Sequence, residues 1–300
     1  MTTKELSKGI SIVIPTIGRD SITNVLNSIH LDETLIQHEI VIVANSKICK
    51  KIKQSYSEYK CIKLVIQEKA SISKSRNKGI SHCKFNIISL VDDDDLWVNG
   101  RTKLFQDELQ INQKAVVFGS AQFNVIGRKM KVQLGANQRI NFEDYKNIFK
   151  PKILSKQDFF LQVGNSAFLN NTQLPKFNEK IAYLEDQIWI LDLFQKGFEV
   201  NQIEEITLEY FFSRERANCR WDIVTEKEIF MRLNKIDSVL ARKYVFKRSL
   251  KSLALSLNKN LFNKAKLEIT REFQPRLKEK LQILFLSVIN ICFRVWRKQF

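Results

Sequence analysis

The most constraining feature of this sequence is an apolar run that ends in four consecutive carboxylates. Residues 86–91 have the composition of a buried β-strand, and Asp92, Asp93, Asp94 and Asp95 follow directly. Because open α/β sheets bind ligands beyond the carboxyl ends of their strands, this strand would hold the carboxylates at a binding edge. Closely spaced oxygen ligands suit a hard divalent cation, Mg²⁺ or Mn²⁺, that also binds substrate phosphates. The alternative is a solvated acidic turn that caps the next helix.

Short apolar segments with the composition of strands alternate with helical segments through the first two thirds of the chain. This alternation predicts an α/β fold with a doubly wound, mostly parallel sheet. We predict helices over 101–112 and from 185 to 196, and an irregular stretch over 129–165. The predicted strands are residues 10–14, 38–43, 61–66, 86–91, 115–118, 121–126, 164–169, 198–202 and 206–212.

The composition fits one large folded domain with an appendage. Three hundred residues with 44% hydrophobic content can bury a substantial core. The low numbers of Gly (nine) and Pro (four) argue against flexible linkers and favour regular structure. Five Cys without paired spacing argue against a zinc site or a disulfide framework and favour a reducing compartment. The chain begins without a signal peptide and contains no apolar run of roughly 18 residues. We therefore expect a cytoplasmic protein that is neither exported nor integral to a membrane.

The positive charge is concentrated in the last 80 residues. Of the net charge of +17, a net +11 lies in residues 221–300, with 18 Lys and Arg against 7 Asp and Glu. Such a concentration fits an anionic surface of lipid headgroups or nucleic acid. Within it, residues 281–293 carry no charge and end in Arg294, Trp296 and Arg297. This stripe predicts a helix that lies in a membrane interface or, equally, one that packs on the catalytic domain or on a twin subunit.

The polar segment directly before the apolar run that ends in the four carboxylates carries a second motif. The order S-x-S-x-x-R-N-x-G-I, a short strand and then D-x-D-D-x-W resembles the donor-site core of glycosyltransferase family 2, inverting enzymes with the GT-A fold that use nucleotide-sugars. Each piece alone is a weak signal, whereas their order and spacing together are fairly specific. The matching residues are Ser71, Ser73, Arg76, Asn77, Gly79, Ile80, Asp92, Asp94, Asp95 and Trp97.

The resemblance covers roughly residues 8–216 and implies a fold and a donor site. It implies a GT-A catalytic domain, with a Rossmann-like, mostly parallel sheet, over residues 1–216, followed by a basic helical extension over 217–300. Asp92 and Asp94 would bind a divalent cation, Mn²⁺ or Mg²⁺. Ala44 and Asn45 stand where family members commonly have an Asp pair, so the identity of the nucleotide stays open. The implied donor contacts are Pro15, Thr16, Arg19, Asn45, Arg76, Asn77, Asp92 and Asp93.

A second acidic pair precedes the predicted helix that begins at residue 185. Glu185 and Asp186 come before Ile188, Leu191 and Phe194, whose spacing marks one buried helix face. Acids in a first turn are also what the helix dipole favours, so a simple N-terminal charge is the competing interpretation. The resemblance implies instead that Asp186, with Glu185 beside it, supplies the general base.

Together these features predict an inverting transfer of a sugar from a nucleotide-sugar to a hydroxyl of a surface-glycan or lipid-linked acceptor. If the C-terminal stripe binds lipid, we expect a peripheral protein on the inner face of the plasma membrane; if it packs on a twin subunit, we expect a homodimer. One alternative is a nucleotidyltransferase acting on sugar phosphates, although its usual Gly-rich loop is absent. Others are a catalytically dead scaffold and a non-catalytic basic protein that binds nucleic acid or membrane. The tail shows no recognised nucleic-acid module, so no nucleic-acid partner is expected.

Overall fold

The computed structural model describes most of the first 212 residues and parts of the rest. Two compact units divide the chain. The first comprises Met1–Tyr145, Lys156–Glu179 and Leu184–Asn218, and the second comprises Lys146–Ser155, Lys180–Tyr183 and Cys219–Phe300. The described residues are 7–68, 71–125, 128–131, 138–145, 161–170, 173–181, 183–212, 223–235, 237–242, 244 and 283.

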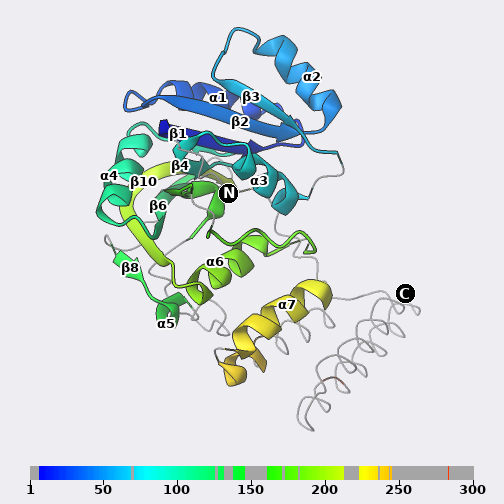
Figure 1. The fold of residues 1–300 in the computed structure, drawn as a ribbon, viewed down its shortest axis with the longest axis vertical. Coiled ribbons are helices and arrows are strands. Elements are labelled where there is room, and N and C mark those ends of the chain that lie inside the picture. The colour runs from blue at the N-terminus through cyan, green and yellow to red at the C-terminus, as the bar shows by residue number, and fades with distance from the viewer. Residues whose placement is uncertain are drawn as a thin grey trace, which may run out of the picture. The chain divides into compact units, whose positions relative to one another are not determined.

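The described part of the first unit contains one sheet in the order β3-β2-β1-β4-β9-β6-β10-β5, with β7 beside β6 and β8 beside β10. Strand β1 pairs in parallel with both β2 and β4, and β2 pairs in parallel with β3 (Figure 1). Strand β6 pairs in parallel with β10, whereas β9 runs antiparallel between β4 and β6. This mixed α/β fold with a mostly parallel central sheet confirms the predicted fold class. The strands are β1 Ser7–Pro15, β2 His38–Ala44, β3 Ile62–Ile66, β4 Phe85–Leu90, β5 Leu96–Trp97, β6 Ala115–Val125, β7 Arg128–Lys131, β8 Gln138–Ile140, β9 Ser166–Leu169 and β10 Glu199–Phe212.

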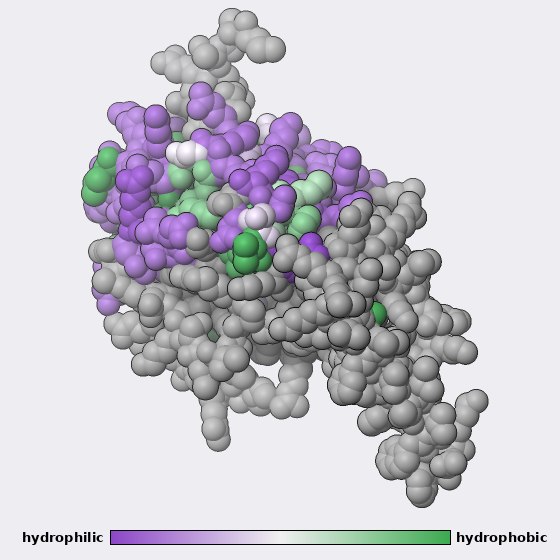
Figure 2. Space-filling model, turned by 90° about the horizontal axis from the view of Figure 1, so that it is seen from below, coloured by the Kyte–Doolittle hydropathy of each residue, from purple (hydrophilic) through white to green (hydrophobic). Residues whose placement is uncertain are grey.

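Helices of the first unit bury one apolar side against this sheet. In α1, Val25, Leu26 and Ile29 are fully buried, as their spacing requires for one helix face. The outward side of the unit is polar: on the face drawn in Figure 2 the described residues are mostly hydrophilic, with hydrophobic side chains in small separate groups. The helices are α1 Ile22–His30, α2 Ser46–Ser55, α3 Ile72–Ser81, α4 Arg101–Ile111, α5 Phe142–Tyr145 and α6 Glu185–Gln195, with a 3-10 turn at Val163–Asn165.

Two predicted pairs of strands are each a single long strand. The pair predicted at 115–118 and 121–126 is β6, which runs straight through Gly119. A Cβ on Gly119 would lie 1.7 Å from the Thr207 side-chain oxygen, so this glycine lets β10 approach closely rather than breaking the strand. The pair predicted at 198–202 and 206–212 is β10, which continues through two shifts of register against β6. Within the stretch predicted to be irregular, β7, β8 and α5 are regular, and residues 132–137 and 146–160 lie outside the described residues.

The second unit contributes helix α7, Ile223–Asn234, to the described residues. Within this unit the hydroxyl of Tyr183 hydrogen-bonds to Glu226 at 3.0 Å. The uncharged stripe over 281–293 lies outside the described residues except for Ile283, so its role and the domain division at 216 stay predictions. Among the helices that can be described, none is both long enough and apolar enough to cross a membrane.

Candidate functional site

The four consecutive aspartates lie in a folded, largely buried segment where β4 ends. The backbone N–H of Val91 donates to Val13 in β1, so the acidic segment begins beside the end of the first strand. Asp93 and Asp95 are only 2% and 0% exposed, while Asp92 and Asp94 are half-buried. The solvated acidic turn considered from the sequence is therefore not what forms here.

Asp93 holds the loop that follows β1 next to the acidic segment. Thr16 donates its hydroxyl to Asp93 Oδ2 at 2.5 Å, and Arg19 forms an ion pair with the other oxygen. Ser21 donates to the backbone carbonyl of Asp93 at 2.7 Å. Arg19 also lies 3.4 Å from Asp94. The predicted donor residues of the first loop and of the acidic run thus form one connected group beyond Pro15, the last residue of β1.

Arg76 links the acidic segment to the start of α6. It is carried by α3, which packs so closely on β1 that a Cβ on Gly79 would lie 2.4 Å from Val13. Its guanidinium group lies 3.0 Å from Asp92, 3.2 Å from Glu185 and 3.7 Å from Asp186. Burial lowers the pKa of Arg76, but these three carboxylates outweigh it and hold the pKa above its ordinary value. Two acidic motifs about 90 residues apart in sequence therefore share one buried cation.

Glu185 and Asp186 are the first two residues of α6 and differ in environment. Leu184 before them has a left-handed backbone with φ of 58°, which is unusual for a residue with a branched side chain and turns the chain sharply into the helix. The Glu185 side chain is 12% exposed, and that of Asp186 is 37% exposed. Burial, and then the charge of Asp186, raise the pKa of Glu185 well above its usual value. Glu185 therefore tends to keep its proton, whereas Asp186 is open to an incoming group.

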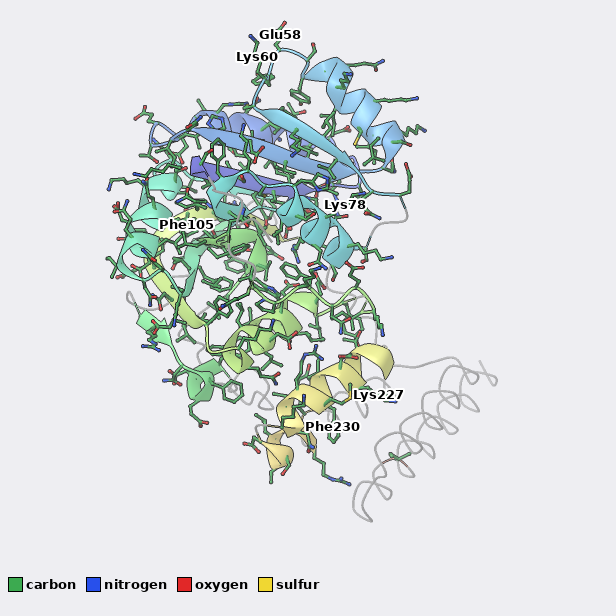
Figure 3. The ribbon with its side chains drawn as sticks, viewed as in Figure 1. Glu58, Lys60, Lys78, Phe105, Lys227 and Phe230 are labelled. Carbon is green, nitrogen blue, oxygen red and sulfur yellow. The ribbon has the colours of Figure 1, made fainter. Side chains whose placement is uncertain are left out.

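Arg101 and Gly164 form the floor beneath Asp92. A Cβ on Gly164 would lie 2.8 Å from Asp92 Oδ2, so only glycine allows this approach of backbone to carboxylate. Arg101 is fully buried and donates from Nη2 to the carbonyls of Leu90, at 2.8 Å, and Gly164, at 3.4 Å. The Arg101 guanidinium also packs over Phe105 of α4, labelled in Figure 3, with 5.0 Å from Cζ to the ring centre. The position of Asp92 is thus set by the 3-10 turn below it.

Asp95 and Tyr210 lie at the side of the acidic segment nearest β10. Asp95 accepts from the Gln162 amide at 2.8 Å and from the Phe211 backbone N–H at 3.3 Å. Burial, followed by the charge of Asp92, raises the pKa of Asp95 to about 8. Burial, with the charges of Asp95, Asp92 and Asp186, raises the pKa of Tyr210 to about 12, so its hydroxyl stays protonated beside the carboxylates.

The tryptophan of the acidic motif has a structural partner that the sequence did not indicate. Trp97 donates its indole N–H to Asp32 Oδ2 at 2.8 Å, and the Thr102 hydroxyl donates to the same oxygen at 2.8 Å. The backbone N–H of Gly100 and the hydroxyl of Thr34 donate to Asp32 Oδ1 at 3.0 and 2.6 Å. Burial alone would raise the pKa of Asp32, but these four donors lower it to about 2. Asp32 therefore anchors the end of the motif and the start of α4.

Two predicted donor contacts are engaged elsewhere in the first unit. The Asn45 side-chain oxygen caps α2 by accepting from Ile48 N at 2.9 Å, so a nucleotide contact would have to use its amide N–H₂ group. The Asn77 side chain accepts from Phe177 N at 2.8 Å and donates to Phe177 O at 2.9 Å and to Glu179 at 3.0 Å. Of the other predicted residues, Asp92, Glu185 and Asp186 contact Arg76, whereas Thr16 and Arg19 contact Asp93. Sequence reasoning did not single out Arg101, Gly164 or Tyr210, because a basic helix start, a glycine before a strand and a strand tyrosine carry no distinctive signal.

The donor set near Asp92 and Asp94 suits a hard cation that takes most of its ligands from substrate. Within the described ranges, no group of three or more His, Cys, Asp or Glu side chains is arranged to hold a metal ion by itself. Asp92 and Asp94 supply only oxygen atoms, and their side chains are 24% and 16% exposed. Mg²⁺ and Mn²⁺ commonly bind through one or two carboxylates together with water and phosphate oxygens. The residues present therefore fit such an ion.

Comparison with known proteins agrees with this geometry. The family model described as Glycosyl transferase family 2 matches residues 11–168, which is just over half of the chain. No curated protein sequence matches the chain significantly. Among solved structures, S. aureus TarS 1–349 in complex with UDP-GlcNAc is 13% identical with a TM-score of 0.61, covering 93% of this chain and 79% of that one. S. aureus TarS is 15% identical with a TM-score of 0.55, covering 91% of this chain and 47% of that one, and at these identities the likeness shows the fold alone. By the family match, this chain belongs to glycosyl transferase family 2.

Proposed function

We propose that this protein is an inverting glycosyltransferase that moves a sugar from a nucleotide-sugar to an acceptor hydroxyl. Family membership supports the class of reaction and favours it over the alternatives considered from the sequence. One observation carries the assignment of roles: Arg76 contacts Asp92 of the donor motif and both Glu185 and Asp186. The groups proposed to accept the proton and to hold the donor therefore contact one guanidinium, at Nη1 and Nη2, and lie close enough to act on the same bound donor.

On the donor side, the loop held by Asp93 would contact the nucleotide. Thr16 and Arg19 are fixed by Asp93 and lie beyond Pro15, at the edge where open α/β sheets bind ligands. The side chain of Arg19 is 45% exposed and so remains accessible to an anionic donor. The solved structure of TarS with UDP-GlcNAc makes UDP-sugars the first donors to test. In this proposal Asn45 would use its amide N–H₂ group, and Asn77 would support Arg76 through Phe177, whose ring centre lies 5.4 Å from Arg76 Cζ.

A divalent cation would complete the donor site. Asp95 and Glu185 have raised pKa values that favour their protonated forms, but the four remaining carboxylates, Asp92, Asp93, Asp94 and Asp186, still outnumber the three arginines Arg19, Arg76 and Arg101. Asp92 and Asp94 would hold Mn²⁺ or Mg²⁺, which when bound neutralises the charge of the diphosphate.

Asp186 would act as the general base. In a single displacement the acceptor oxygen forms a bond to the anomeric carbon while the bond to the diphosphate breaks, and the hydroxyl proton passes to Asp186. Attack from the face opposite the leaving group inverts the configuration. Asp186 is better placed than Glu185 because it is more exposed and because Glu185 has a raised pKa that favours its protonated form. Glu185 would instead help to position Arg76.

The acceptor we propose is a hydroxyl of a surface glycan or a lipid-linked glycan. Support comes from the basic region over 217–300, whose net positive charge would bring the enzyme to an anionic membrane surface where such acceptors reside. This part of the proposal rests on composition alone and is tested separately below.

One experiment separates the two carboxylate roles. Asp186→Asn and Asp94→Asn are compared with the parent for transfer from a panel of UDP-sugars and for Mn²⁺-dependent thermal stabilisation by the same donors. Asp186→Asn should keep donor stabilisation and lose about 10²- to 10⁴-fold in turnover, because an amide cannot accept the proton. Asp94→Asn should lose the Mn²⁺-dependent stabilisation itself. If Asp186→Asn keeps most of its turnover, the base is another group; if Asp94→Asn binds donor as the parent does, the metal role is wrong.

A further inference from the structure

A cavity of about 520 Å³ lies at the end of the sheet away from the acidic segment. It opens where β1 and β4 begin, beside Gly9 and Asn86, and all its lining residues belong to the first unit. Asn86 and Asp92 are six residues apart along β4 and its continuation, which corresponds to about 20 Å in an extended chain. The volume is in the range of small-molecule sites, roughly 300–1,000 Å³. The cavity is therefore distinct from the proposed donor site.

Amide side chains converge on this cavity from four different segments. Gln106 and Gln110 are one turn apart on the same face of α4, Gln113 follows the end of that helix, and Gln37 precedes β2. Gln37, Gln110 and Gln113 are exposed and Gln106 is half-buried, and none of these four side chains takes part in a hydrogen bond with the described residues. Asn86 is held in place by accepting from Gly9 N at 2.9 Å. The cavity thus presents groups that can both donate and accept hydrogen bonds and that are open to a ligand from solvent.

The rest of the lining is apolar and almost uncharged. Ile87, Leu109 and Leu169 supply aliphatic surface between the amides, and among the described residues Lys8 is the only charged side chain of the lining. None of the described lining residues carries a carboxylate, so they offer no counter-charge to a metal ion or a cationic ligand. A purely apolar ligand would cover the amides without satisfying them, which is unfavourable.

From these features we propose that the cavity binds a saccharide. Sugar hydroxyls both donate and accept, as carboxamides do, and the C–H faces of a sugar ring pack on aliphatic side chains. The single lysine allows a neutral or an acidic sugar. A glycan segment held here lies about 20 Å from the reacting edge of the sheet. The site is therefore an accessory glycan site, and it stands whether or not the proposed transfer reaction is correct.

The test is a titration of the full chain with methyl-labelled Ile, Leu and Val, followed by NMR. The probes are maltopentaose, cellopentaose and chitopentaose, added without donor or metal. Binding of at least one probe should shift the methyl signals of Ile87, Leu109 and Leu169 and leave that of Val91, at the acidic edge, unchanged. The double variant Gln106→Leu with Gln110→Leu should bind that probe at least about tenfold more weakly, because two hydrogen-bonding groups are lost. Gln54→Leu, at an exposed glutamine on α2, is the matched control and should bind as the parent does.

Several results would overturn the proposal. These are the absence of any shift at the three cavity methyls with all probes, equal affinity in the double variant, or binding that is lost in Lys8→Gln and at high salt but not in the glutamine variants. If the double variant fails to fold, Gln37→Leu removes an amide from the segment before β2 without altering α4, and its affinity decides instead. If the unmutated protein transfers sugar but binds none of the probes, the accessory site is wrong and the transferase proposal is unaffected.

Discussion

At the scale of single residues, the position of Asp92 depends on the absence of a side chain at Gly164. The carboxylate is held between Arg76, at 3.0 Å, and the backbone of the 3-10 turn. Arg101 fixes that turn through the Gly164 carbonyl. A change at Gly164 would therefore act on the donor site although the residue has no chemistry of its own.

Gly164→Ala should weaken donor binding by roughly tenfold or more, because a Cβ 2.8 Å from Asp92 Oδ2 must displace the carboxylate. The measurement is the thermal stabilisation of the variant by UDP-sugars with Mn²⁺, beside its melting temperature alone. If the variant alone melts within a few degrees of the parent but no longer binds donor, the fold is intact and the loss of binding is due to displacement of Asp92. Unchanged donor affinity would mean that Asp92 adjusts without consequence.

Asp32 is a second residue whose role is purely structural. Asp32→Asn should lower the free energy of unfolding by about 2 kcal/mol, since an amide cannot accept from Trp97, Thr102, Gly100 and Thr34 together. Urea denaturation at neutral pH measures this loss. The sign of the pH dependence follows from the lowered pKa: the stabilisation is present above the ordinary value of 3.8 and is lost as the pH falls toward about 2.

A matched control for Asp32 is Asp20→Asn, because the Asp20 side chain is fully exposed and, in the part of the chain that the structure describes, pairs only with Lys51 at 3.5 Å. The control should leave the free energy of unfolding almost unchanged. Equal stability of Asp32→Asn and the parent would show that the four donors find other partners.

At the scale of elements, the start of α6 brings an acidic pair into a partly buried position at a cost in stability. The left-handed Leu184 and the buried Glu185 are both unfavourable by themselves. Arg76 offsets part of this cost, since it contacts both acids of the pair. The helix therefore begins where the site requires it rather than where the backbone is most relaxed.

Glu185→Gln should flatten the pH dependence of stability. Above the ordinary pKa of 4.5 the unfolded chain loses the Glu185 proton while the folded chain keeps it, so the free energy of unfolding of the parent falls as the pH rises toward the folded pKa. Gln carries no such proton and removes this contribution. Urea denaturation at several pH values from about 5 to about 8 measures the slope.

The control for this slope is Glu58→Gln, at the exposed loop residue labelled in Figure 3, which should keep the pH dependence of the parent. A Glu185→Gln variant whose stability falls as steeply as that of the parent would show that Glu185 is ionised throughout this range.

At the scale of the whole molecule, charge is distributed unevenly along the chain. Residues 221–300 carry a net +11 of the total +17, whereas the donor motif gathers acidic side chains. We predict that this basic region brings the enzyme to membranes and contributes no catalytic group. Most of it lies outside the described residues, so this stays a prediction.

Removal of residues 281–300 should release the protein from anionic vesicles while sparing transfer to a soluble acceptor analogue. The segment carries an uncharged stripe and three basic residues, and each basic residue near an anionic leaflet contributes about 1 kcal/mol. Co-sedimentation with vesicles containing phosphatidylserine, at low and high salt, measures binding. A truncated protein that unfolds, or that dissociates from a dimer, would identify the stripe as a packing surface.

The sequence by itself determined the local features of the protein. Strand and helix periodicity predicted the α/β class, and the run of β-branched residues before Pro15 and before Asp92 placed two strand ends at one edge. The reason is that burial on both faces of a parallel strand demands continuous apolar residues, a pattern visible in any short window. The spacing of the motifs around Arg76 and Asp92 likewise predicted the family, which the family match confirmed.

Only the tertiary structure decided how these pieces meet. Arg76 bridges Asp92 and Glu185 because α3 and α6 pack against the same sheet, and no local pattern encodes a contact across more than 100 residues. Arg101 is buried under the site although a basic residue at a helix start usually faces solvent. The glutamines of α4 line a cavity because β1 and β4 begin beside them, which the helix sequence does not indicate. Periodicity fixes which face of an element is apolar, while the partners of its polar groups depend on which distant elements the packing brings alongside.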